Sequence, residues 1–304
     1  MGLAGREYMA WFPGGATRAA AAALVALFVV GIPSSRAAGK TVVDGAGRTI
    51  EVPDRPARIV SLAPSATEML FALGAGDRVV GVTDFCEHPK EAAKLPRIGG
   101  LINPDLERIL KLKPDLAVAS TSGNYLDDTE RLAELGVPVY AIETPDVAGI
   151  LNAFLGLGDL LGDPERSRAV VQRLRERLEK VRAAASSGPR PVVLFVIEPD
   201  PLIAPGRETF IGEALEIAGG SAATTGTAAR WAQYDLEQVI AMRPDVILTT
   251  PIHAAWAERL PSMGDWRSVP AVAGGRIHVV SDAIQSPGPR LIDGIEEVAK
   301  ILRR

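Results

Sequence analysis

The chain carries one segment twice, as "DLERILKLKPDL" at 105–116 and as "DLEQVIAMRPDV" at 235–246. Each copy begins with an aspartate, continues with an apolar pattern of helical period, and ends with a basic residue, Pro-Asp and an apolar run. Proline stops a helix, and a short all-apolar run predicts a buried strand. The copies lie too far apart in sequence for a solenoid repeat, so they predict two similar lobes.

Strands and helices alternate around each copy. In the first half we expect a strand at 58–62, a Pro-Ser turn, and a helix that is capped by Ser65 or Thr67 and ends at Gly74. The second half repeats this plan in "RPVVLFVIEPDPLIAPGRETFIGEALEIAGG". Such alternation predicts a parallel sheet covered by helices on both faces. The expected fold class is therefore α/β, with two similar lobes that have parallel central sheets.

A single long helix is expected to join the lobes. Asp163 can cap it, Pro164 fits its first turn, and apolar residues recur at helical spacing as far as Ser186. At 1.5 Å per residue this helix would be about 33 Å long, enough to cross a domain. The predicted divisions are a signal peptide at 1–37, an N-terminal hairpin extension at 38–57, a first lobe at 58–162, the linking helix at 163–187 and a second lobe at 188–304.

The first forty residues predict export. Arg6 and Arg18 precede an uncharged apolar run that has the length of a signal-peptide core and is short for a bilayer span. Small residues at Ser35 and Ala37 place the expected cleavage after Ala37, and an uncleaved anchor is the alternative. Cys86 is the only cysteine, so we expect neither a lipidated N-terminal cysteine nor an intrachain disulfide. The expected location is the periplasm.

Charge and motifs argue against several classes of function. The formal net charge is -4 and the cations are scattered, which leaves no basic surface for nucleic acid. The sequence has no nucleophile elbow and no phosphate loop. Its three histidines, His88, His253 and His278, are far apart and lack the spacing of metal ligands. We therefore expect no catalytic residue, no cofactor and no metal held by the protein alone.

The chain resembles a known family from about Thr41 onward. Beside the repeated segment, the resemblance rests on "RIVSLAPSATEMLFALGAGDRVVGVTDFCEHP", "APGRETFIGEAL" and "SPGPRLIDGIEEVAKIL". These blocks are similar to the periplasmic substrate-binding proteins of ABC importers for iron-siderophores, haem and cobalamin, and most closely to the cobalamin branch. The resemblance implies a large ligand between two lobes, little hinge movement, and delivery to a permease dimer in the membrane.

The resemblance also gives the repeated segment a role. The family docks through one surface glutamate on each lobe, and these positions fall on Glu107 and Glu237. Two carboxylates on linked lobes can meet two symmetry-related basic pockets in only one orientation. The alternative is simpler, because a carboxylate in the first turn of a helix is favoured by the helix dipole alone.

Ligand contacts are expected outside the carboxyl ends of the strands, where parallel sheets bind ligands. In the first lobe the candidates are Pro64, Phe85, Leu101, Asn124 and Tyr125, and in the second lobe they are Ile203, Trp231, Tyr234, His253 and Asp282. We place Trp231 and Tyr234 in a loop ahead of a helix, where an aromatic ring could cover a macrocycle. Packing between the lobes is the alternative for Trp231. The resemblance implies that Trp231 and Phe85 contact cobalamin and that Asp282 meets the corrin side.

Other positions depart from the cobalamin pattern. Leu101 and Ser120 stand where cobalamin binders can carry tryptophan, and Gln285-Ser286 replace a basic contact after Asp282. His88 could reach the metal of a corrinoid or of haem.

The leading hypothesis is an extracytoplasmic receptor for a corrinoid, with cobalamin as the expected ligand. The alternative within transport is a ferric-siderophore or haem receptor, with Arg207, Arg230 and Arg290 as its candidate cations. The alternative from another class is a chelatase-like or nitrogenase-like enzyme with two lobes.

Overall fold

The computed structural model describes residues 39–224 and 230–303, so the predicted signal peptide lies outside the described residues. The described chain begins with an antiparallel hairpin of β1 (Gly39–Val43) and β2 (Thr49–Pro53). The Asp44 carboxylate accepts hydrogen bonds from the backbone N–H groups of Ala46 and Arg48, which fixes the turn. A hairpin therefore lies within the range 38–57, where the sequence predicts one. Within the two described ranges, no helix combines the length and the apolar character that crossing a bilayer requires.

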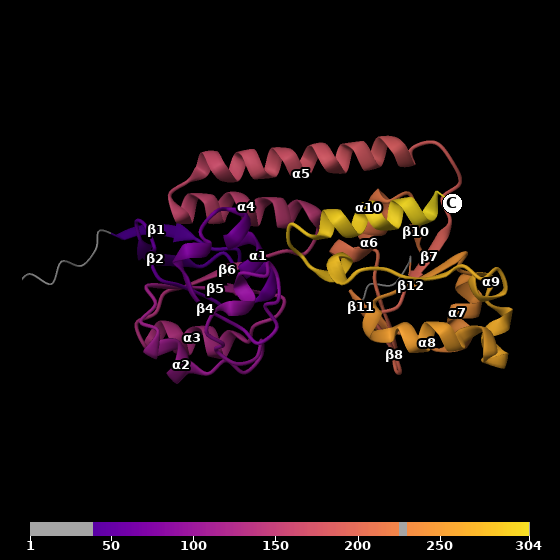
Figure 1. The fold of residues 1–304 in the computed structure, drawn as a ribbon, viewed down its shortest axis with the longest axis horizontal. Coiled ribbons are helices and arrows are strands. Elements are labelled where there is room, and N and C mark those ends of the chain that lie inside the picture. The colour runs from indigo at the N-terminus through magenta and orange to yellow at the C-terminus, as the bar shows by residue number, and fades with distance from the viewer. Residues whose placement is uncertain (1–38, 225–229, 304) are drawn as a thin grey trace, which may run out of the picture. The chain divides into compact units, whose positions relative to one another are not determined.

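The first lobe, in which Figure 1 labels β4, β5 and β6, is built on a parallel four-stranded sheet in the order β4-β3-β5-β6. Its strands are β3 (Ile59–Ser61), β4 (Val79–Val82), β5 (Leu116–Ser120) and β6 (Val139–Ile142). Its helices are α1 (Pro64–Ala72), α2 (Leu106–Lys111), α3 (Leu126–Glu134) and α4 (Val147–Leu161). All five residues of β5 are buried, as expected for a central strand that is covered on both faces.

The second lobe repeats this sheet with a parallel sheet in the order β10-β7-β12-β13. Its strands are β7 (Val192–Phe195), β10 (Ser221–Ala222), β12 (Val246–Thr249) and β13 (Ile277–Val279). Its helices are α6 (Phe210–Ile217), α7 (Leu236–Met242), α8 (Ala254–Arg259), α9 (Pro270–Ala273) and α10 (Leu291–Leu302). In both sheets the strand before the first helix and the strand after the repeated segment form the central pair. The predicted pair of similar α/β lobes is confirmed.

The repeated segment does the same structural work in both lobes. Asp105 and Asp235 cap α2 and α7 by accepting hydrogen bonds from the backbone N–H groups of Arg108 and Gln238. The basic residue before each proline, Lys113 or Arg243, adopts a left-handed conformation with φ of 50° or 49°. This conformation ends each helix and turns the chain into the following strand.

The aspartate of each Pro-Asp pair holds the central strands together. The carboxylate of Asp115 accepts hydrogen bonds from the backbone N–H groups of Ala57 and Arg58, at 2.8 and 2.9 Å. Asp245 makes the matching contact to the N–H group of Val192, at 2.8 Å. In each lobe, these hydrogen bonds connect the residue before β5 or β12 to the start of the neighbouring central strand, which is β3 or β7.

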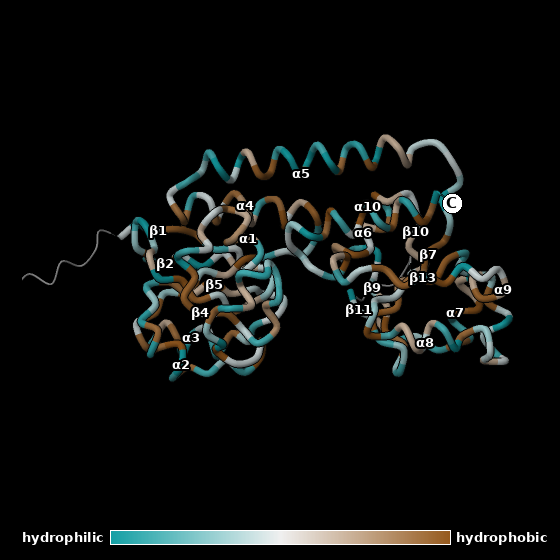
Figure 2. Tube along the Cα trace, in the orientation of Figure 1, coloured by the Kyte–Doolittle hydropathy of each residue, from teal (hydrophilic) through white to brown (hydrophobic). Residues whose placement is uncertain are grey.

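Helix α5 (Pro164–Ala185) connects the lobes and packs on α4 of the first lobe and on α10 and α6 of the second. Its N-cap is Asp163, as predicted, and Pro164 occupies its first turn. Hydrophobic residues recur along an otherwise hydrophilic helix (Figure 2), and those that are buried are Val170, Val171, Leu174, Leu178 and Val181. The helix therefore contributes one apolar stripe to a core that it shares with both lobes.

Three local features differ from expectation or were not anticipated. The cap predicted at Ser65 or Thr67 is wrong, because both residues lie inside α1, whose N-cap Ala63 makes no side-chain cap bond. Helix α4 was not expected from the sequence. An antiparallel sheet in the second lobe was not expected either; it is formed by β8 (Glu198–Pro199), β9 (Leu202–Pro205) and β11 (Trp231–Gln233).

Polar contacts also join the halves away from α5. The Glu213 carboxylate on α6 accepts a hydrogen bond from the N–H group of Val147 at the start of α4, at 2.7 Å. Arg230 donates to the carbonyl of Pro145, at 2.8 Å. These contacts attach the second lobe to the loop between β6 and α4 of the first.

Ion pairs from Arg177 to Glu296 and Asp293 attach α5 to the second lobe, and their contribution to stability can be tested. Arg177 donates to both carboxylate oxygens of Glu296, at 2.9 and 2.8 Å, and to Asp293, at 2.6 Å. The hydrogen bond from Arg177 lowers the pKa of Glu296 below its ordinary value of 4.5. A lowered carboxylate pKa stabilises the folded state above pH 4.5, and this stabilisation is lost as the pH falls through the folded-state pKa.

We therefore expect Arg177→Ala to lower the free energy of unfolding by about 1 kcal/mol at pH 7 and by less at acidic pH. Urea denaturation across this pH range measures the effect. Arg175→Ala, on the exposed side of the same helix, is the control. A loss that is equal for both variants, or that grows on acidification, would contradict the assigned role.

Candidate functional site

A cavity of about 620 Å³ is lined by residues of both lobes. From the first lobe it takes Ala63, Pro64, Ser65, Glu68, Phe85, Glu87, His88, Leu101, Ser120, Ser122 and Gly123. From the second lobe it takes Ile197, Ile203, Phe210, Ile211, Trp231, Asp282, Gln285, Ser286, Pro287 and Arg290. Many of these residues follow the carboxyl ends of parallel strands, as expected for a ligand site in such sheets.

The cavity brings together six of the ten residues predicted to contact a ligand, which are Pro64, Phe85, Leu101, Ile203, Trp231 and Asp282. The other four do not line it. Tyr125 is an exposed N-cap of α3, Tyr234 is buried in the second-lobe core, and His253 lies 3.9 Å from the Glu198 carboxylate. Asn124 is half-buried. Whether any of these residues contacts a ligand stays a prediction.

Asn124 connects three segments next to the cavity. Its side-chain carbonyl accepts a hydrogen bond from the N–H group of Ser120, at 2.8 Å. Its amide group donates to the carbonyls of Leu62 and Leu101, at 2.9 and 2.8 Å. One side chain thus fixes the ends of β3 and β5 together with the loop that carries Leu101.

Aromatic side chains from both lobes reach the cavity. Phe85 of the first lobe is 64% exposed and Trp231 of the second is 47% exposed, which is unusual for rings of this size. Trp231 begins strand β11, so the predicted loop position is wrong. Pairing with β9 places it beside Phe210, edge to face, with ring centroids 6.4 Å apart. Phe210 was missed, because its helical apolar pattern gave no sign of a ligand contact.

A chain of charged groups crosses the cavity wall from one lobe to the other. Glu68 on α1 is almost fully buried, and its Oε1 accepts hydrogen bonds from Ser286, at 3.0 Å, and from Arg290, at 3.4 Å. Arg290 also donates to Asp282, at 2.6 Å. The Oε2 atom of Glu68 is buried without a hydrogen-bond partner. Sequence reasoning missed Glu68, because a glutamate within a helix usually faces solvent.

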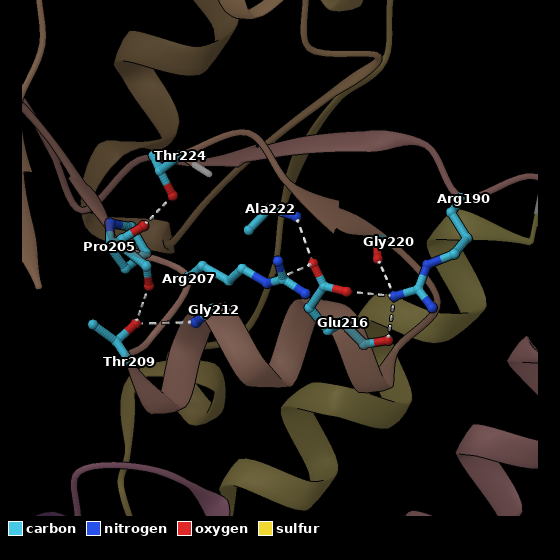
Figure 3. A network of polar contacts seen from close by, with 10 residues as sticks. Arg190, Pro205, Arg207, Thr209, Gly212, Glu216, Gly220, Ala222 and Thr224 are labelled. Carbon is cyan, nitrogen blue, oxygen red and sulfur yellow. Dashed lines mark hydrogen bonds and ion pairs between the residues drawn. The ribbon is translucent and has the colours of Figure 1, made fainter. Parts of the chain in front are cut away.

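The other two arginines considered as ligand cations are engaged elsewhere. Arg207 lies 3.8 Å from the carboxylate of Glu216, which also pairs with Arg190 at 2.6 Å (Figure 3). Arg230 donates to the carbonyl of Pro145. Neither residue lines the cavity, which leaves Arg290 as the arginine on the part of its wall that the structure describes.

The two repeated glutamates occupy equivalent positions away from the cavity. Glu107 and Glu237 are each the second residue of their helices, two positions after the capping aspartate, and both are exposed. Glu107 lies 3.8 Å from Lys111 on the same helix. Neither glutamate lines the cavity, so both are free to meet another molecule.

A protein site for a metal ion needs several histidine, cysteine or acidic side chains close together. Across 39–224 and 230–303, no three such residues come together in a way that could hold a metal ion. His88 lines the cavity by itself, where it could meet a metal that a ligand carries. Cys86 is buried and lies 3.1 Å from the hydroxyl groups of Thr67 and Thr83, so its thiol does not face the cavity wall.

The buried glutamate makes stability depend on pH in a predictable direction. Burial raises the pKa of Glu68 above its ordinary value of 4.5, although Arg290 and Ser286 oppose the rise. The folded state then binds the proton more readily than the unfolded chain does. Between pH 4.5 and the raised pKa, the contribution of Glu68 to stability falls as the pH rises.

Glu68→Gln removes this titration. We expect the unfolding free energy of the parent protein, minus that of the variant, to fall as the pH rises from 4.5 toward neutrality. Urea denaturation at a series of pH values measures it, with Glu258→Gln on the exposed side of α8 as the control. A difference that rises with pH would mean that the ion pair with Arg290 outweighs burial.

The comparisons with known proteins agree with this geometry. The family model described as periplasmic binding protein matches residues 59–283. The vitamin B12-binding protein of Vibrio parahaemolyticus is 31% identical over 250 residues, which cover 80% of this chain and 88% of that protein.

Solved structures match the fold closely. The crystal structure of the periplasmic vitamin B12 binding protein BtuF of Vibrio cholerae has a TM-score of 0.74 and 27% identity, over 83% of this chain and 98% of that one. A periplasmic haem-binding protein from Pseudomonas aeruginosa has a TM-score of 0.73 and 28% identity, over 81% and 92% of the two chains. The family model matches most of this chain, and the Vibrio parahaemolyticus protein covers four fifths of it. The chain therefore belongs to the periplasmic binding protein family.

Proposed function

We propose that this protein binds a corrinoid, with cobalamin as the expected ligand, in the cavity between its lobes and delivers it to an ABC permease. The observation that carries the proposal is the character of the cavity. Its wall combines exposed aromatic rings from both lobes with few charged groups. Among the described residues of the wall, three are acidic and one is an arginine, Arg290. Export across the inner membrane, with cleavage after Ala37, is part of the proposal.

The balance of charges favours a ligand with a neutral rim. Glu68, Glu87 and Asp282 line the cavity, and Arg290 already pairs with two of these acids. A ferric catecholate is polyanionic and haem carries two propionates, so either ligand would need cationic groups that are free. The rim of cobalamin carries neutral carboxamides. The engagement of Arg207 and Arg230 elsewhere disfavours a siderophore for the same reason.

A haem receptor is the second candidate, and one observation favours it. His88 lines the cavity, and an imidazole is a common axial ligand of haem iron. The similarity to a haem-binding protein of 28% identity is compatible with this alternative. A chelatase-like enzyme is the candidate from another class, and turnover of a tetrapyrrole and a metal ion would support it.

Calorimetric titration with cyanocobalamin, haemin and a ferric siderophore tests the choice of ligand. We expect cyanocobalamin to bind, and we expect Trp231→Ala to weaken its binding by about 1–3 kcal/mol, the scale of an aromatic anchor. Trp266→Phe, in the second-lobe core, is a control for general damage to that lobe. Binding of haemin or the siderophore under conditions where cyanocobalamin gives no heat would overturn the proposal.

Docking through Glu107 and Glu237 is tested separately from ligand binding. Charge reversal of both residues to lysine should abolish uptake of labelled cyanocobalamin by cells that depend on this protein, because the contacts to permease arginines are lost. Affinity for the ligand should stay unchanged, since neither residue lines the cavity. Glu179→Lys, an exposed ion-paired glutamate on α5, is the matched control. Loss of affinity, or normal uptake, would contradict the docking assignment.

A further inference from the structure

One loop of the second lobe reaches across to the first lobe beside the cavity. This bridging loop, residues 286–290, joins the 3-10 helix η6 (Asp282–Gln285) to α10. Ser286 and Arg290 of the loop both donate hydrogen bonds to Oε1 of Glu68 on α1, at 3.0 and 3.4 Å. Both donor residues also line the cavity, so the bridging loop is part of the cavity wall.

The two ends of the bridging loop are anchored in the second lobe, whereas its middle lies against α1. Ile284 before the loop and Leu291 after it are fully buried in the core. At Gly288, an added Cβ would stand 3.3 Å from Oε2 of Glu68 and 3.7 Å from the carbonyl oxygen of Ser65. The place of the middle of the loop therefore depends on its contact with α1.

The contact between Glu68 and the bridging loop leaves the carboxylate incompletely satisfied. The Glu68 side chain is 5% exposed, and its Oε2 is buried without a hydrogen-bond partner. An ionised carboxylate in such a place costs more free energy than a neutral carboxyl, because the charge has lost its hydration. Accordingly, burial raises the pKa of Glu68 above 4.5, although Arg290 and Ser286 oppose the rise.

The other charged groups around Glu68 do not remove this cost. Arg290 is shared with Asp282, to which it donates at 2.6 Å, and the negative charge of Asp282 itself disfavours ionisation of Glu68. Glu87 and His88, which follow β4, line the same cavity, and α1 has no other titratable side chain within its bounds. Among these neighbours, only His88 has an ordinary pKa near neutrality.

We propose that Glu68 and the bridging loop form a proton-controlled latch in the cavity wall, which is closed on α1 while Glu68 is protonated and is released as Glu68 ionises. The closed form has the higher proton affinity, so the latch opens as the pH rises through the pKa that Glu68 has in the closed form. The inference goes beyond the proposed function and does not depend on which ligand the cavity takes. Any ligand that contacts the bridging loop binds more tightly while the latch is closed.

Hydrogen exchange followed by mass spectrometry tests the latch without a ligand. The readout is the exchange rate of a peptide that covers 285–292, where the N–H groups of Gly288 and Leu291 are hydrogen-bonded. Parent and Glu68→Gln are compared at the same pH, so that the intrinsic pH dependence of exchange cancels. Glutamine keeps the size of Glu68 and stays neutral, so it holds the latch closed at every pH. We expect the ratio of the parent rate to the variant rate to be near one below pH 4.5 and to rise above it, up to about 10-fold for each pH unit by which burial raises the pKa.

Peptides from the central strands β5 and β12 separate the latch from general stability. Their ratio should stay near one while that of 285–292 rises, and within the parent alone the exchange of 285–292 should rise in the same way relative to β5. Glu258→Gln, an exposed change on α8, should exchange like the parent at every pH. His88→Gln should keep the pH dependence of the parent. A ratio that does not change with pH, or that rises equally in β5 and β12, would overturn the latch. Loss of the dependence in His88→Gln would overturn the assignment to Glu68.

Ligand binding supplies a second readout, which depends on the proposed function. Titration of cyanocobalamin from about pH 5 to about pH 8 should give a dissociation constant that rises with pH in the parent and stays constant in Glu68→Gln. If cyanocobalamin does not bind, the proposed function fails, and hydrogen exchange still decides the latch. An affinity that is equally independent of pH in both proteins would overturn the claim that the latch controls ligand binding.

Discussion

The packing of α5 across both lobes is the constraint on which the rest of the structure depends. Its apolar stripe enters a core that also contains α4 of the first lobe and α6 and α10 of the second. The Arg177 ion pairs and the contacts of Glu213 and Arg230 add polar attachments along the same boundary. Since the cavity takes its walls from both lobes, its dimensions follow from these contacts. A shift of one lobe would move Phe85 relative to Trp231 and break the hydrogen bond between Arg290 and Glu68.

The repeated segment, at 105–116 and 235–246, accounts for shared features of the two lobes and for the position of the two proposed docking residues. Each repeated segment caps a helix, ends it at a left-handed basic residue and ties two strands together through an aspartate. The second residue of each helix, Glu107 or Glu237, is exposed. The repeat thus places two carboxylates, Glu107 and Glu237, at equivalent positions in the two lobes.

The fold was largely predictable from the sequence because its signals are local. Caps such as Asp163, breakers such as Pro114 and apolar runs such as 116–120 act over a few residues, and they gave the lobes and the linking helix. The antiparallel sheet of β8, β9 and β11 was not predictable in this way. Trp231 pairs with Pro205, and a local sequence pattern does not predict a pairing between segments that far apart.

The site was predictable only in part, for a related reason. Trp231 stood out because large aromatic residues are scarce in this chain, and Phe85 because it lies in a loop that follows a predicted strand. Glu68 did not, because its burial depends on Ser286 and Arg290, more than two hundred residues away in sequence. The role of Asn124 in the fold was not predicted either: its three hydrogen bonds join segments that are distant in sequence, and its contact with a ligand stays a prediction.

The crystal structure of the protein grown with cyanocobalamin tests the central claim most directly. The account predicts the corrin ring between the lobes, with Phe85 and Trp231 against it. A corrinoid bound outside this cavity, or bound inside it away from both of these rings, would contradict the account.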